Sequence, residues 1–462
     1  MSIPNRVSPS ESRIARLNEA VFSTLEQATS DNLHDDPKYY ARTPRELLST
    51  SNSLAFETGT GSTIYETLRP LLESANHELI LVTCFWAQSK SLDTINDILV
   101  HLSHKGIEKG VRIRVRICFS SLSIFQKLFH TQKVSGQTYP PSVWRSKLGL
   151  PSPEMLTGLD LEIKSVFLLP FSVMHPKFMI VDRRIAVMPS CNVSWEKWFE
   201  GYVKFTGPAV NDLLKFYSKF WERREELPPL GAEAVAAETS HHGSVPTFLL
   251  PSPHRRNPRF QPFTSTENVR APHTPLNAFI LTLIDKANSK IIIQTPNLTS
   301  PPVLSALLKA LARGVDVQIT TSENLMVIEQ LVTAGTTTPR CVRKLRKRHM
   351  KLVSEWESRV GTGDEEAIAG LVRPGNLQLF YFRPKNGLKR KGQENGEPQQ
   401  SHLKMMVVDD DVVVLGSGNL DRASWFTSQE LGIAFFDRRL VAKVIQAVEA
   451  SMNERRVRVT AS

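Results

Sequence analysis

The chain lacks the features that mark several specialised classes of protein. Its 462 residues include four cysteines and no C-x-x-C pair, so neither a zinc knuckle nor a disulfide scaffold is indicated, and a reducing compartment fits best. The longest apolar runs are far shorter than the roughly 20 residues of a membrane-spanning helix. The N-terminal residues contain no apolar stretch of the kind that forms a secretory signal. We therefore expect a cytoplasmic or peripheral membrane protein.

Acidic residues are in the minority. Lys and Arg number 57 against 46 Asp and Glu, which gives a formal net charge of +11. At 41% hydrophobic and 22% charged residues the composition is that of a folded globular protein and excludes wholesale disorder. The basic excess favours an anionic partner such as phosphate, nucleic acid or acidic lipid. A basic run over 340–351 is compatible with contact to acidic headgroups, with contact to a phosphate backbone, with a nuclear-import signal or with an ordinary solvated helix face.

One order of elements occurs twice along the chain. An apolar pattern of helical period over Ile64–Glu73 precedes a β-rich run, Leu79–Phe85. The same order returns at Leu276–Lys286 and Ile291–Thr295, and each half continues with another helix, a glycine and a strand. Such alternation predicts an α/β fold of two repeats related by a pseudo-twofold axis, with mixed sheets flanked by helices.

Composition also suggests domain boundaries. Proline-rich and alanine-rich stretches near the middle of the chain read as a connecting segment. The predicted units are an N-terminal accessory arm (1–58), a first domain (59–225), a linker (226–270) and a second domain (271–462).

A short polar motif occurs once in each half. The first copy is His175, Lys177 and Asp182, followed by Ser190 and Asn192. The second copy has the same spacing: His402, Lys404, Asp409, Ser417 and Asn419. In each copy the four residues before the aspartate are apolar, which predicts a buried strand with the histidine and lysine on one face just before it.

These residue types suit chemistry on a phosphodiester. Neutral imidazole is a nucleophile and protonated imidazole is an acid, so two histidines facing one phosphate can divide these roles. Lysine ammonium groups and asparagine amides donate to phosphate oxygens as their charge grows. The sequence contains no Walker loop and no convincing carboxylate cluster, so we expect neither a metal nor a cofactor.

A glutamate follows each motif, Glu200 in the first half and Glu430 in the second. A carboxylate behind a histidine fixes its tautomer and favours the imidazolium, and we expect these two to have that orienting role. For Asp182 and Asp409 we expect a structural duty, in which they tie the backbone of the motif together.

The paired motif, H-x-K-x4-D-x6-G-S-x-N, resembles the signature of the phospholipase D superfamily over most of residues 60–450. The resemblance implies one composite active site between the halves and a phosphohistidine intermediate. It marks both His-Lys-Asp sets as candidate catalytic residues and makes His175 the expected nucleophile and His402 the expected acid and base. It also implies that Lys177, Ser190, Asn192, Lys404, Ser417 and Asn419 bind the substrate phosphate. The sequence departs from the signature at Pro189, where the family has glycine, which predicts an altered first phosphate-binding turn.

Size and organisation look most like cardiolipin synthase and related phosphatidyltransferases. We therefore expect a metal-independent hydrolase or phosphatidyltransferase acting on phospholipid, with peripheral contact to an acidic membrane surface. Because both motifs lie in one chain, we expect a monomer. Two alternatives stay open: a nuclease that uses the same site, and a catalytically silent protein that binds acidic lipid or nucleic acid.

Overall fold

Two mixed sheets of the same design form the centre of the protein. The computed structural model describes residues 9–122, 134–167, 173–230, 244–253, 270–361, 371–390 and 392–460. In the first sheet the strand order is β5-β3-β2-β6-β7-β8-β1, with β5, β3 and β2 parallel and every later pair antiparallel. Its strands are β1 (Leu48–Gly59), β2 (Glu78–Phe85), β3 (Ile113–Ser121), β5 (Leu159–Ser165), β6 (Phe178–Val181), β7 (Ile185–Pro189) and β8 (Trp198–Thr206), with the short β4 (Gln137–Thr138) beside β5.

The second sheet repeats this plan. Its order is β12-β11-β10-β14-β15-β16-β9, again parallel over the first three strands and antiparallel thereafter. The strands are β9 (Val245–Ser252), β10 (Lys290–Thr295), β11 (Asp316–Thr321), β12 (Leu377–Phe382), β14 (Met405–Val408), β15 (Val412–Gly416) and β16 (Glu430–Phe435), with β17 (Arg456–Arg458) outside β12. The mixed α/β fold predicted from the alternating pattern is thus confirmed.

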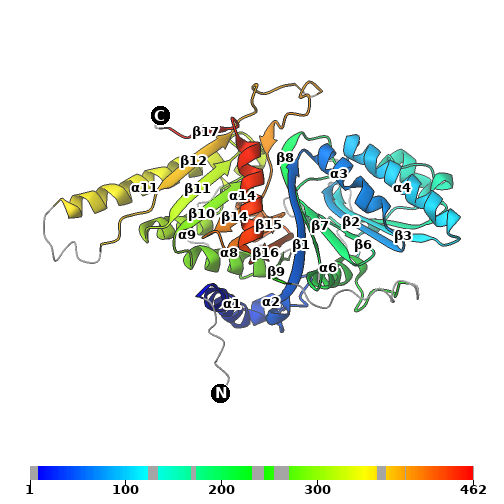
Figure 1. Cartoon of the computed structure of the whole chain (residues 1–462), viewed down its shortest axis with the longest axis horizontal. Helices are drawn as coiled ribbons and strands as arrows, with labels where there is room; N and C mark the ends of the chain where they lie inside the picture. The colour runs from blue at the N-terminus through cyan, green and yellow to red at the C-terminus, as the bar shows by residue number, and fades with distance from the viewer. Residues whose placement is uncertain are drawn as a thin grey trace, which may run out of the picture.

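Strand β1 joins the two sheets. Residues Asn52–Gly59 pair with β8, and Leu48–Ser51 pair with β9, so this long strand runs between the halves (Figure 1). The predicted accessory arm, 1–58, therefore contains a central strand. Period-two alternation is weak in this segment because the strand contacts different neighbours along its length.

The predicted linker, 226–270, also contains a sheet strand. Residues 231–243 and 254–269 of that segment lie outside the described residues, but Val245–Ser252 forms β9 between β1 and β16. Pro246 and Pro251 argued against a strand because proline has no N–H to donate. Successive N–H groups of an antiparallel strand point alternately to its two neighbours, so each proline costs one bond, and the Pro246 carbonyl still accepts from Phe436.

Helices cover the outer faces of both sheets and fill the space between them. Outside the first sheet lie α3 (Gly61–Glu73) and α4 (Lys90–Glu108), and outside the second lie α8 (Pro275–Asp285), α9 (Pro301–Ala312) and α1 (Pro9–Gln27). A central cluster combines both inner sheet faces with α6 (Ala209–Tyr217) and α14 (Arg438–Met452). Within it the rings of Phe205 and Phe435 are 5.8 Å apart. This shared core fixes one half against the other.

Other helices lie around this framework. They are the short α2 (Thr29–Asn32) and α13 (Arg422–Phe426), then α10 (Val327–Ala334) and the long α11 (Thr338–Val360), with single turns at Pro44–Leu47, Pro141–Val143, Trp144–Leu148, Pro153–Leu156 and Ser218–Glu222. Helix α11 extends outward from the second half on the side away from β1 (Figure 1). Of the helices in the described ranges, none is both long enough and apolar enough to cross a bilayer.

Candidate active site

The two histidine–lysine pairs lie just before equivalent central strands. Lys177 directly precedes β6 and Lys404 directly precedes β14, and all residues of both strands are buried. Burial on both faces is what the apolar spacers predicted. Lys177, His402 and Lys404 are themselves no more than 4% exposed, and a charged group is buried to this extent only where other polar groups surround it.

Each histidine is paired with the glutamate of the other half. Nδ1 of His175 lies 2.9 Å from Oε2 of Glu430, and Nδ1 of His402 lies 2.7 Å from Oε1 of Glu200. A carboxylate only accepts, so each Nδ1 carries the proton and each Nε2 is left for other partners. The exchange brings both motifs into one site, which neither half forms alone.

Backbone bonds hold each histidine against the other half. The His175 N–H donates to the carbonyl of Gln429 at 2.9 Å, and the His402 N–H donates to that of Phe199 at 2.8 Å. Gln429 and Phe199 are the residues directly before the two glutamates. Around His402 this contact extends into a short parallel pairing of β13 (Gln400–Ser401) with β8. Both imidazoles are thus placed by main-chain geometry.

The motif serines support the glutamates. Ser190 donates from Oγ to Glu200 at 2.5 Å and accepts from the Gly201 N–H. Ser417 donates to Glu430 at 2.5 Å and accepts from the Leu431 N–H. These hydroxyls, predicted as phosphate contacts, are occupied by the carboxylates in this structure. Serine, glutamate and histidine form one chain of hydrogen bonds in each direction across the interface.

The first motif turn keeps this geometry despite Pro189. The Ser190 N–H donates to the Gly201 carbonyl at 2.8 Å, as the Ser417 N–H does to Leu431 at 3.0 Å. Pro189 pairs with Tyr202 as Gly416 pairs with Gly432. The alteration expected from the proline is thus not found in the hydrogen bonds of the serine. Gly416 itself has φ +153°, and a Cβ there would lie 2.4 Å from the Leu431 carbonyl oxygen.

The two lysines have different partners. Lys177 donates from Nζ to the carbonyl of His175 at 2.8 Å. Nζ of Lys404 lies 2.8 Å from both ring nitrogens of His402, and because Nδ1 donates to Glu200, Nε2 is the atom able to accept from Lys404. Lys404 therefore lies against the imidazole of His402 itself.

Burial and charge tune the ionisable groups. Burial lowers the pKa of His402 to about 3 and that of Lys404 to about 7, although Glu200 opposes both shifts. Burial also lowers the pKa of His175, against the opposing effect of Glu430. Burial alone would raise the pKa of Glu200, but its contacts with His402, Lys404 and Ser190 lower it overall. Both histidines are thus neutral near pH 7.

The motif asparagines flank the site with different contacts. Asn192 accepts through Oδ1 from the Phe85 N–H at 3.3 Å. Asn419 donates from Nδ2 to Asp421 at 3.0 Å. Asp421, which also accepts from the Ser424 N–H at 2.9 Å and attracts Lys404 electrostatically, was missed in the sequence. Its place two residues after the motif asparagine was the available signal, but the first half has Ser194 there.

The two motif aspartates lie past the far ends of β6 and β14, away from the histidines. Asp182 accepts from the N–H groups of Asn76, His77 and Glu78. Asp409 accepts from those of Asn288, Ser289 and Lys290, and also pairs with Arg13 of α1. A four-residue strand spans about 13 Å, which separates these carboxylates from the histidines.

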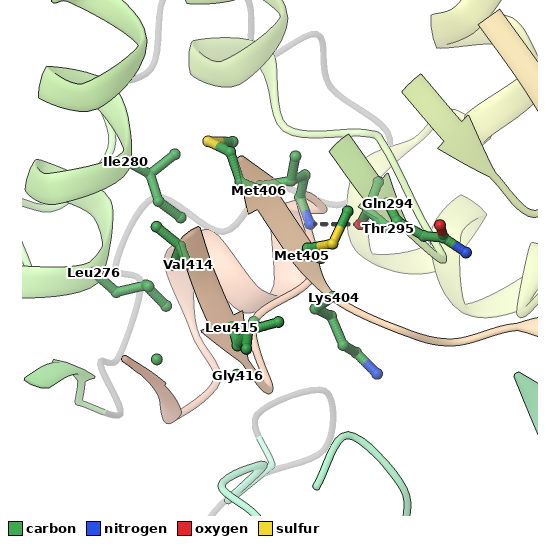
Figure 2. Close-up of a pocket in the computed structure, with 13 residues that line it drawn as sticks. Leu276, Ile280, Gln294, Thr295, Lys404, Met405, Met406, Val414, Leu415 and Gly416 are labelled. Carbon is green, nitrogen blue, oxygen red and sulfur yellow. Dashed lines mark hydrogen bonds between the residues drawn. The ribbon is translucent and has the colours of Figure 1, made fainter. Parts of the chain in front are cut away.

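A small cavity adjoins Lys404. It measures about 30 Å³ and lies between α8 and the β14–β15 hairpin, with Leu276, Ile280 and Val414 among its apolar lining residues (Figure 2). Figure 2 also shows the Lys404 side chain directed away from Leu276 and Ile280. Among the described residues, no group of three or more His, Cys, Asp or Glu side chains is arranged to hold a metal ion.

Comparisons with known proteins bear on the domain and the fold. The family model described as "Cardiolipin synthase, PLD-like domain" matches residues 280–452. The structure is similar to that of phosphatidylserine synthase from Haemophilus influenzae Rd KW20, with a TM-score of 0.51, 13% sequence identity and 89% of each chain covered. Residues 280–452 thus match a phospholipase D-like domain, and the structural similarity shows a shared fold over most of the chain.

Two further solved structures are less similar to this chain. Polyphosphate kinase from Porphyromonas gingivalis is 12% identical over 86% of this chain and 47% of its own, with a TM-score of 0.46. The phospholipase D family member Nuc from Salmonella typhimurium is 16% identical over 46% of this chain and 98% of its own, with a TM-score of 0.26. No curated protein matched the sequence.

Proposed function

We propose that this protein is a metal-independent phosphodiesterase or phosphatidyltransferase that acts on phospholipid through a phosphohistidine. The exchange of Glu–His pairs between the halves carries the proposal: His175 with Glu430 and His402 with Glu200. Because each Nδ1 is paired with a glutamate, we assign the two Nε2 atoms, one from each half, to the substrate phosphate. Two lysines beside them supply positive charge for its oxygens.

In the first step, His175 is the nucleophile. Its side chain is 12% exposed, against 3% for His402, and its low pKa keeps the ring neutral. Nε2 attacks phosphorus while the bond from phosphorus to the leaving alcohol breaks, and His402 gives that oxygen a proton from its own Nε2. Before this step the negative charge of the bound phosphodiester raises the pKa of His402, and its Nε2 takes up a proton from solvent.

The second step reverses the proton transfer. His402 removes a proton from water or an acceptor alcohol, whose oxygen attacks phosphorus as the P–N bond to His175 breaks. Glu430 and Glu200 stabilise the imidazolium that forms at each stage, and Ser417 and Ser190 hold these carboxylates in place. We assign Asp182 and Asp409 to the support of the strand ends, because their partners are backbone N–H groups.

The lysines and asparagines are the proposed phosphate ligands. Lys404 moves from Nε2 of His402 to the phosphate when substrate binds, which frees this nitrogen for proton transfer. Lys177, Asn192 and Asn419 complete the donor set. The proposal for Asn192 and Asn419 rests on their matched positions after the two serines.

The test is turnover of phospholipid vesicles by the full chain, measured as release of headgroup or its replacement by an added alcohol. His175→Ala and His402→Ala must each abolish it, whereas His101→Ala, at an exposed histidine of α4, must not. Chelator must leave turnover intact. Cleavage of nucleic acid with the same sensitivity to both histidines, and no phospholipid turnover, would replace the lipid assignment with a nuclease.

A further inference from the structure

Helix α10 (Val327–Ala334) has its apolar side outward. Its buried side chains are the polar Gln330 and Thr333. Ile328 is 80% exposed and Met326, just before the helix, is 38% exposed. Val327, Leu331 and Val332 are part-exposed on the same side, which is the reverse of the usual orientation of a surface helix.

Specific hydrogen bonds fix this orientation. The Gln330 carbonyl oxygen Oε1 accepts from the Thr338 N–H at 2.6 Å and from its hydroxyl at 2.9 Å. Nε2 of Gln330 donates to the Leu325 carbonyl at 2.6 Å. Because these buried polar groups would lose their partners if the helix turned over, the fold holds the apolar side in solvent. Such a contiguous exposed apolar patch marks an interaction surface.

The patch lies at the sheet edge that carries the histidines. Helix α10 follows the carboxyl end of β11, where Thr321 pairs with Thr295 of β10. Next to it, Gln294 pairs with Met405, the residue after Lys404. Ser322 donates to the carbonyl of Ser401, directly before His402, at 2.8 Å. The segment that leads into α10 therefore lies on the sheet edge that carries His402.

Exposed basic side chains follow in the next helix. Helix α11 begins at Thr338, and its first turns expose Arg340, Arg343 and Lys347 on one face, at spacings of three and four residues. Aliphatic groups bordered by cations at one edge match the two layers of an anionic bilayer surface, acyl chains below phosphate. A nucleic-acid surface would use the cations but not the aliphatic groups.

We propose that α10 and the start of α11 dock this protein onto an anionic phospholipid bilayer, with Ile328 inserted at the acyl boundary and Arg340, Arg343 and Lys347 on the headgroups. This inference rests on the proposed function and extends it. It names the surface through which the protein would contact the membrane that holds its substrate. It predicts that α10 lies against the membrane while the histidines face a headgroup.

Partition onto vesicles tests the proposal without turnover. The full chain is mixed with phosphatidylcholine vesicles that contain or lack phosphatidylglycerol, and the bound fraction is measured by flotation. Ile328→Asp is expected to weaken binding to the anionic vesicles about tenfold or more. The matched control is Ile107→Asp, at a 57% exposed isoleucine near the end of α4, which is expected to bind as the wild type does.

Charge reversal separates the electrostatic part. Arg340→Glu with Lys347→Glu is expected to weaken binding to anionic vesicles at least twentyfold, at about fivefold for each basic side chain removed. Added salt must reduce binding of the wild type more than that of this variant. The control with the same charge change is Arg439→Glu with Lys443→Glu, two exposed positions of α14, which is expected to have little effect.

The outcomes decide the matter separately from catalysis. His175→Ala must partition like the wild type, and Ile328→Asp must still hydrolyse a soluble phosphodiester if the wild type does. Equal partition of the Ile328 and Ile107 variants overturns the proposal. So does a concentration-dependent dimer that Ile328→Asp abolishes without vesicle binding, or binding to RNA that only the charge reversal removes. Selective loss of partition with no phospholipid turnover supports the docking surface and rejects only the proposed activity.

Discussion

The two halves of the active site share a skeleton but differ in what surrounds each histidine. In both, a serine holds a glutamate that pairs with the histidine of the other half. Around His402, however, Lys404 lies 2.8 Å from the ring nitrogens and the ring of Trp198 is 4.6 Å away. Lys177 instead donates to the backbone carbonyl of His175. The repeated strands and glutamates therefore fix where the two histidines lie. The neighbours that differ between the halves give the two histidines different chemical roles.

The largest expected effect comes from removing either imidazole. His175→Ala and His402→Ala should each reduce kcat by about 10⁴-fold or more, since nucleophile and acid act as a unit. They should differ with an activated substrate whose leaving group needs no proton. His402→Ala should then accumulate an acid-labile phosphohistidine, detected by mass spectrometry, and His175→Ala should not. Accumulation in the His175 variant instead would reverse the assigned roles.

The exchanged glutamates should show the next largest effect. Glu430→Gln and Glu200→Gln keep the shape but lose the charge that stabilises an imidazolium, so each should lower kcat about 10²- to 10³-fold. Glu430→Gln should slow formation of the phosphohistidine, measured by rapid quench. Glu200→Gln should matter mainly for leaving groups that need a proton. Identical dependence on leaving group in both variants would contradict the division of labour.

Lys404 should set the alkaline limb of the pH profile. Its pKa is lowered to about 7 by burial, so the ammonium is charged below pH 7 and neutral above it. Loss of this charge weakens phosphate binding, and kcat/KM should fall about tenfold for each pH unit above 7. Lys404→Arg should move the limb to higher pH, because guanidinium keeps its proton. Lys177→Arg, the matched change in the first half, should leave the limb near pH 7.

The aspartates should give the smallest catalytic effect and a measurable effect on stability. Asp182→Asn and Asp409→Asn lose charge-assisted bonds to backbone N–H groups, which should lower the free energy of unfolding by about 1–3 kcal/mol in urea titrations. The larger loss is expected for Asp409→Asn, because Arg13 loses its partner as well.

The stabilisation from Asp409 should also depend on pH. Burial alone would raise its pKa, but the N–H groups of Lys290, Asn288 and Ser289 lower it overall, below 3.8. Its contribution should therefore be complete above the unfolded-state value and disappear as pH falls through the folded-state value. If Asp409→Asn lowered kcat as much as the histidine variants do, Asp409 would take part in the chemistry, contrary to the structural role assigned to it.

Much of this protein was determined by local sequence. The helices and strands around both repeats, the buried strands Phe178–Val181 and Met405–Val408, and the glycine that ends each helix before a strand all follow from periodicity and φ preference. Strand β9 could not be predicted in this way. Its two prolines argue against a strand, and only the positions of the two neighbouring strands show that the remaining N–H and C=O groups can pair. The backbone support given by Asp182 and Asp409 follows the sequence-based expectation for them.

Pairing across the halves was decided by the tertiary structure alone. The sequence identified two histidines and two glutamates as candidates. Glu200 is 202 positions from its partner His402, and no local pattern encodes such a contact. The orientation of α10 also depends on the tertiary structure. Its periodicity is that of an ordinary amphipathic helix, but the buried hydrogen bonds of Gln330 turn its apolar side toward solvent. Local sequence sets which face of an element is apolar; what that face meets depends on contacts between residues far apart in the chain.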